Sequence, residues 1–112
     1  MEINNKEISS NAIRYFANDE NGREIAHAYL YLIKNDLHNE PYGLIEDVYV
    51  DENYRGQKLG SLLVEKIIEE AKTRDCYKII CTSRREGREN VHGWYEKLGL
   101  KKYGYEFRMN LK

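Results

Sequence analysis

Residues 48–63 read VYVDENYRGQKLGSLL, a β-rich run that passes through a short loop into an amphipathic pattern. Gly56 and Gly60 lie four residues apart in this loop, and Arg55 and Lys58 add local positive charge. The first turn of a helix leaves backbone N–H groups unpaired and carries a partial positive charge, so it can bind an anion. Glycine lets the backbone approach such a ligand closely.

The same loop also fits a plain helix start with two solvated cations and two turn glycines. Gly-x-x-x-Gly spacing is unspecific by itself. The loop lacks the Gly-Lys-Ser/Thr ending of a Walker loop and the Gly-x-Gly-x-x-Gly pattern of a Rossmann fold. The glycines alone therefore leave a phosphate site and an ordinary helix start both open.

The sequence around this loop predicts alternating strands and helices. Strands are expected at Ala12–Ala17, Glu24–Ile33, Gly43–Val50, Tyr77–Thr82 and Tyr103–Leu111, and two main helices at about Gly60–Thr73 and Asn90–Leu98. The first helix is indicated by apolar positions at helical spacing, namely Leu59, Leu62, Leu63, Ile67 and Ala71. The polar turn Asn18–Gly22 predicts a hairpin, and Gly99 predicts the end of the second helix. This order is typical of an α/β fold with a mixed sheet, and we expect one domain over residues 1–112.

Composition limits the classes of function. The 112 residues carry a formal net charge of −1, which gives no general attraction to nucleic acid or to anionic membranes. The uncharged run Ile25–Ile33 is far too short to span a bilayer, and the N-terminus shows no secretory pattern. Cys76 and Cys81 are expected to be reduced packing residues, so we expect a cytoplasmic protein.

Several motifs together resemble the GCN5-related N-acetyltransferase (GNAT) superfamily over about nine-tenths of the chain, from Ala12 onward. The stretch Asp47–Leu63 is similar to the family's acetyl-CoA motif, and Arg55-x-x-Lys58-x-Gly60 departs from its Gln/Arg-x-x-Gly-x-Gly/Ala loop only at Lys58. The branch resembling glucosamine-6-phosphate N-acetyltransferase also has a longer side chain there. Four segments look like that branch: Ile45–Val48, Tyr54–Gly56, Cys76–Ile80 and Asn90–Gly99.

The resemblance implies acetyl-CoA (coenzyme A as acetyl carrier) as donor and an amine as acceptor. It implies a bulge that splays Asp47–Val50 from Tyr77–Thr82, so that backbone amides near Val48 and Val50 pair with the pantetheine and the thioester oxygen. The implied coenzyme-binding residues are Val48, Tyr49, Val50, Arg55, Gly56, Gln57, Lys58, Leu59, Gly60, Ser61, Asn90 and Tyr95. Asn90 is expected to cap its helix, to bond the pantetheine amide, or to do both.

The chemistry needs a neutral amine and a leaving thiol, which points to three candidate catalytic residues. Glu46 and Asp47 are adjacent on a strand and should point to opposite faces. Glu46 would share a mostly apolar face with Leu44, Val48 and Val50, which would raise its pKa toward that of a useful base. Both carboxylates are also explained as structural groups. Tyr95 is implied as proton donor to the departing thiolate, although its spacing also fits a core aromatic.

The acceptor is expected to be a small amine, an amino sugar or a protein amine, with a non-catalytic acetyl-CoA-binding module as the alternative. Most relatives have a strand and two helices before the first hairpin, where this chain has about eleven residues. This difference predicts an open acceptor groove or a second subunit closing it, and an exposed Glu24–Ile33 edge would favour a homodimer. We expect no metal, and His27, His38 and His92 receive no role.

Overall fold

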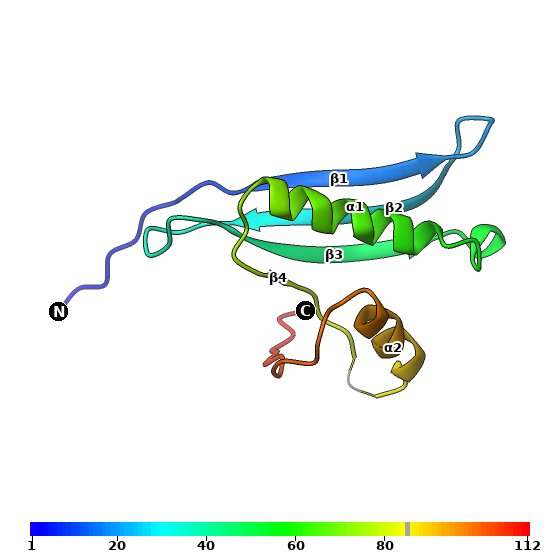
Figure 1. The fold of residues 1–112 in the computed structure, drawn as a ribbon. Coiled ribbons are helices and arrows are strands. Elements are labelled where there is room, and N and C mark those ends of the chain that lie inside the picture. The colour runs from blue at the N-terminus through cyan, green and yellow to red at the C-terminus, as the bar shows by residue number, and fades with distance from the viewer. Residues whose placement is uncertain (85) are drawn as a thin grey trace. The chain divides into compact units, whose positions relative to one another are not determined.

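Four strands in the order β1-β2-β3-β4 form a mixed sheet in the computed structural model, which describes residues 1–84 and 86–112 (Figure 1). The strands are β1 (Asn11–Asn18), β2 (Glu24–Ile33), β3 (Tyr42–Val50) and β4 (Ile79–Ile80), and the helices are α1 (Leu59–Thr73) and α2 (Glu89–Lys97), with a 3-10 turn at Glu52–Tyr54. The chain divides into two compact units, residues 1–80 and 81–112. The predicted α/β class with a mixed sheet is confirmed, while the single domain remains a prediction.

The first two strands form the predicted antiparallel hairpin. Asp19 organises the turn, because its Oδ1 accepts hydrogen bonds from the backbone N–H groups of Asn21 and Arg23, both at 2.9 Å. Gly22 has a φ of +83°, a conformation that costs glycine little. The polar run between the two apolar runs was therefore a sound turn signal.

The sheet places β2 in its interior, which corrects the prediction of an exposed edge at Glu24–Ile33. This strand pairs antiparallel with β1 on one side and with β3 on the other, so β1 is the edge strand. The parallel pairing of β3 with β4 covers only Gly43 and Leu44, opposite Ile79 and Ile80. A Cβ on Gly43 would lie 3.0 Å from Leu30 Cδ1, so glycine lets these strands pack closely. The predicted strand Tyr77–Thr82 is thus much shorter than expected.

One face of the sheet is covered by α1 (Figure 1). The buried helix side chains are Leu63, Val64, Ile67 and Ala71, and the buried strand side chains are Ile25, Ala26, Ala28, Leu30, Leu32 and Ile45. Fully burying a Leu or Ile stabilises a fold by about 1.5–3 kcal/mol, so these residues hold the first unit together. Leu62, predicted to lie in the apolar stripe, is instead 53% exposed.

The second unit contains α2, whose predicted stop at Gly99 is confirmed. Gly99 has a φ of +103°, and its N–H donates to the Glu96 carbonyl while the Leu100 N–H donates to the Tyr95 carbonyl. These two bonds form a Schellman motif.

The predicted closing strand Tyr103–Leu111 is wrong, because the described part of residues 81–112 contains no strand. The alternating side chains Tyr103, Tyr105, Phe107, Met109 and Leu111 are 75–101% exposed. Alternation assigns side chains to the two faces of a strand, but it supplies no partner for the backbone groups.

Candidate functional site

The segment after β3 is held against the end of that strand. Asp51 accepts a hydrogen bond from the Asn53 N–H at 3.0 Å through Oδ1, which caps the 3-10 turn, and its other oxygen pairs with Arg23. The Asp51 N–H donates to the Ile25 carbonyl at 2.7 Å. Arg55 Nε donates to the Val50 carbonyl at 2.9 Å, so this predicted binding residue folds back over the strand end.

The loop enters α1 through two left-handed residues, Gly56 at φ +81° and Lys58 at φ +61°. Lys58 is the N-cap residue and makes no side-chain cap hydrogen bond, and no acidic side chain lies in the first turn. The positive end of the helix is therefore uncompensated by side chains at these positions, as an anion site requires. Gln57 is exposed beside them, while the first helical residues Leu59, Gly60 and Ser61 are half-buried.

A bulge interrupts β3 beside this loop. Glu46 pairs with Tyr29 and Tyr49 pairs with His27, so two β3 residues, Asp47 and Val48, lie opposite the single β2 residue Ala28. Asp47 has a φ of +51°, which is uncommon for a residue other than glycine. The structure therefore contains a bulge in the strand where the resemblance implied one.

This bulge corrects the predicted surroundings of Glu46. Directly paired residues of an antiparallel ladder share a face, so Glu46 lies with Tyr29 on the face away from α1. Val50 pairs with Ala26, which is buried on the α1 face. The extra residue shifts the alternation of β3 by one, so Glu46 and Val50 do not share an apolar row. Glu46 is half-buried on the face away from the helix, and Asp47 is exposed.

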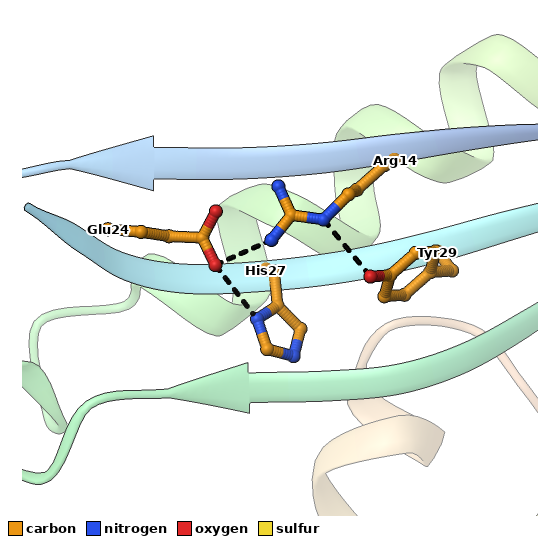
Figure 2. Close-up of polar contacts among 4 residues, drawn as sticks. All are labelled: Arg14, Glu24, His27 and Tyr29. Atoms are coloured by element: carbon orange, nitrogen blue, oxygen red, sulfur yellow. Dashed lines mark hydrogen bonds and ion pairs between the residues drawn. The ribbon is translucent and has the colours of Figure 1, made fainter.

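The same face carries a four-residue polar network that sequence reasoning missed (Figure 2). Arg14 Nη2 donates to Glu24 Oε2 at 2.6 Å, Arg14 Nε donates to the Tyr29 hydroxyl at 3.0 Å, and His27 Nδ1 lies 3.2 Å from the same Glu24 oxygen. Hydrogen bonding to Arg14 lowers the pKa of the Glu24 carboxyl. The register of the hairpin could have indicated part of this set, because it pairs Arg14 with Tyr29.

A second irregularity lets Glu24 reach His27. Ala17 pairs with Ala26 and Asn18 pairs with Glu24, which leaves Ile25 as an extra residue in β2. Residues three apart in a regular strand point to opposite faces, but the extra residue places Glu24 and His27 on the same one. Nothing in the local sequence signals this shift.

The remaining predicted residues, Asn90 and Tyr95, belong to the second unit. The N-cap of α2 is Arg88, so the prediction that Asn90 caps the helix is wrong, and Asn90 lies in the first turn instead. Tyr95 is half-buried in α2, with its ring centroid 4.8 Å from that of Trp94.

Comparisons with known proteins agree on one family. The sequence model of the Acetyltransferase (GNAT) family matches residues 2–100. A glucosamine 6-phosphate N-acetyltransferase of Trypanosoma brucei brucei is 33% identical over 99 residues, which are 88% of this chain and 65% of that protein. The chain therefore spans slightly less than two thirds of that relative.

Solved structures give the same result. The crystal structure of a Trypanosoma brucei acetyltransferase aligns with a TM-score of 0.79 at 30% identity, covering 89% of this chain and 69% of the other. That of glucosamine-6-phosphate N-acetyltransferase from Arabidopsis thaliana aligns with a TM-score of 0.80 at 27% identity, covering 90% of this chain and 67% of the other.

Proposed function

The chain belongs to the acetyltransferase (GNAT) family, and on that premise we propose that it transfers the acetyl group of acetyl-CoA directly to a primary amine. The observation that carries the proposal is the continuous segment from the β3 bulge at Asp47 to the uncapped start of α1 at Lys58. The irregular strand backbone at one end suits the thioester-bearing pantetheine arm. The helix N-terminus at the other end suits the diphosphate.

The residues proposed to hold the coenzyme divide between strand and loop. Val48, Tyr49 and Val50 would present backbone groups to the pantetheine arm, and residues 55–61 would receive the diphosphate at the helix start. The left-handed backbone at Gly56 and Lys58 and the missing cap at α1 support this assignment. Asn90 and Tyr95 of α2 are included on the family pattern. Bound acetyl-CoA would supply an activated acetyl group.

The amine would be received at Glu46, with Asp47 as the alternative. Glu46 is a half-buried carboxylate, and it makes no hydrogen bond or ion pair with the described residues. An ammonium brought against it would gain an ionic partner. Tyr95 is proposed to donate a proton to the departing thiolate, which a phenol can do.

The names of the relatives suggest the class of acceptor. Two of them act on glucosamine 6-phosphate according to their names, so an amino sugar is one candidate beside other small amines and protein amines. A homodimer and a cytoplasmic location also belong to the proposal. Cys76 and Cys81 are both free thiols, as a reducing compartment favours. Among the described helices, none has the length and apolar composition needed to cross a bilayer.

The first test is binding of acetyl-CoA, measured as thermal stabilisation. A ligand at 100 times its Kd adds about 2.7 kcal/mol to the free energy of unfolding. Lys58→Glu should reduce this stabilisation, because it places a negative charge at the proposed diphosphate site. Lys66→Glu, an exposed change within the same helix, is the matched control and should not.

The second test measures the release of free thiol from acetyl-CoA with four amines: glucosamine 6-phosphate, spermidine, a peptide with N-terminal alanine, and a lysine peptide. We expect release with at least one amine, and Tyr95→Phe should abolish most of it while keeping the stabilisation. Stabilisation without release from any amine would identify a non-catalytic acetyl-CoA-binding module. If acetyl-CoA gave no thermal stabilisation and no amine gave thiol release, the proposal would be overturned.

A further inference from the structure

His27 lies at the point where the two strand irregularities meet. The extra residue Ile25 brings Glu24 onto its face from one side, and the β3 bulge brings Tyr49 opposite it from the other. Its side chain is 28% exposed on the face away from α1, and its ring centroid lies 5.4 Å from that of Tyr49. Bulges commonly re-aim side chains beside active sites.

The hydrogen bond to Glu24 determines which ring nitrogen can act as a base. Nδ1 lies 3.2 Å from Glu24 Oε2, and the pKa of that carboxyl is lowered by its bonds to Arg14 and then to His27, so it is an anion that can only accept. Nδ1 therefore carries the hydrogen in the neutral ring, which leaves the lone pair on Nε2. Nε2 makes no hydrogen bond within the described residues.

Arg14 holds Glu24 in this position. Its guanidinium donates to both Glu24 and the Tyr29 hydroxyl, and it lies 5.2 Å from the ring centroid of Phe16. A carboxylate fixed by a guanidinium and turned toward an imidazole is the arrangement that orients a general base. Arg14 and Glu24 would act as positioning residues, since neither one is placed to receive the proton itself.

We propose that His27 takes the proton of the acceptor ammonium through Nε2, while Glu46 holds that ammonium; the inference rests on the acetyl transfer proposed above. Glu46 pairs with Tyr29, the next residue but one from His27 on β2, so both side chains project from the same face at diagonal positions. This assigns the two functions of base and anchor to two groups.

The step balances without any further reactant. One ammonium proton moves to Nε2 and then to water, and the nitrogen lone pair so released forms the new C–N bond to the acetyl carbon. The C–S bond breaks, and the thiolate leaves as a thiol by taking a proton from Tyr95. The nitrogen loses its second proton to water, and Tyr95 regains a proton from water. The products are an amide, coenzyme A and one proton released to solvent.

Five charged or titratable residues of the first unit surround His27 and bear on the pH dependence of the proposed proton transfer. Glu24 and Tyr29 lie beside it on β2, Arg14 approaches from β1, and Glu46 and Tyr49 project from β3. An alkyl ammonium titrates at about 10. A base is therefore needed near neutral pH and becomes unnecessary as the pH approaches 10.

The test is the pH profile of His27→Gln, using whichever of the four amines the unaltered enzyme acetylates best. We expect kcat to fall by about 10²–10⁴-fold near pH 7 while the KM for acetyl-CoA stays within about twofold. The acidic limb of kcat/KM for the amine should disappear, and the loss should shrink steadily toward pH 10. Glu24→Gln should cause a smaller loss and keep the acidic limb.

His38→Gln is the matched control, because His38 lies in the loop between β2 and β3 and its ring contacts Tyr77 and not Tyr49, so the profile should stay unchanged. His27→Asn, with unfolding measured for each variant, guards against a folding defect in His27→Gln. A pH-independent loss would overturn the proposal, as would unchanged turnover in an active enzyme. If the unaltered protein released no thiol with any of the four amines, that result would instead count against the proposed acetyl transfer itself.

Discussion

At the residue scale, left-handed backbone marks both ends of the proposed coenzyme segment. Asp47 and Lys58 are two of the three residues other than glycine with positive φ among the described residues, the third being Asp75. A left-handed conformation costs an ordinary residue roughly 1–2 kcal/mol, and Asp tolerates it better than most because its short side chain bonds locally. The bulge at Asp47 matters because it decides which side chains share a face with Glu46.

The backbone at Asp47 predicts a stability difference between two substitutions. Asp47→Val should lower the free energy of unfolding by about 1–2 kcal/mol, because a β-branched residue fits φ +51° poorly. Asp47→Gly should change it by less than about 0.5 kcal/mol, since relief of strain and greater unfolded-state freedom oppose each other. Urea unfolding measures both. Ala12→Val, at an exposed β1 position outside the left-handed set, is the control, and equal losses in the two Asp47 variants would refute the argument.

At the element scale, local patterns located the first three strands and both helices, but they gave neither the strand register nor the extent of the last two predicted strands. The predicted strand Glu24–Ile33 matches β2 at both ends, and the predicted first helix differs from α1 by one residue. Strand alternation and helical spacing depend only on neighbouring residues, so both can be read locally. The two bulges depend on how strands distant in sequence are registered, which no local pattern encodes.

The same distinction between local pattern and strand register applies to the candidate site. The loop that precedes α1 was visible in the sequence because its glycines and cations are contiguous, while its role in binding the coenzyme remains a prediction. The surroundings of Glu46 were predicted wrongly because the bulge resets the alternation. His27 received no role, since its partner Glu24 reaches it only through the displaced register at Ile25. The closing strand at Tyr103–Leu111 was wrong for a related reason, because pairing needs a partner that alternation does not name.

The C-terminal end of α2 predicts opposite effects for one substitution at two glycines. Gly99→Ala should lower the free energy of unfolding by about 1 kcal/mol, because φ +103° disfavours any Cβ. Gly93→Ala should raise it by roughly 0.5–1 kcal/mol, because Gly93 lies inside the helix and a Cβ there meets no atom within 4 Å. The fluorescence of Trp94, the only tryptophan, reports on this helix. Effects of the same sign at both positions would contradict this account of the helix.

At the scale of the whole molecule, the buried apolar core is concentrated in one part of the chain. Every buried hydrophobic residue among those described falls between Ile25 and Ala71, within the first unit. The face of the sheet that supplies Glu46 and His27 is the one away from this core. Substitutions on the face that carries Glu46 and His27 should therefore leave the core packing intact, since the two sets of side chains project from opposite sides of the same strands.

This division predicts that stability depends far more on the side of α1 that packs against the sheet than on the exposed side of the same helix. Ile67 is 0% exposed, so Ile67→Ala should lower the free energy of unfolding by about 2–5 kcal/mol through lost burial and a residual cavity. Leu62→Ala removes a side chain of the same size from the same helix at a position 53% exposed, and should cost less than about 1 kcal/mol. Small domains have free energies of unfolding of roughly 5–15 kcal/mol, so Ile67→Ala should remove a large part of the stability of the protein. Urea unfolding of both variants measures the contrast, and comparable losses would show that Leu62 also belongs to a packed interface, contrary to the arrangement of α1 described above.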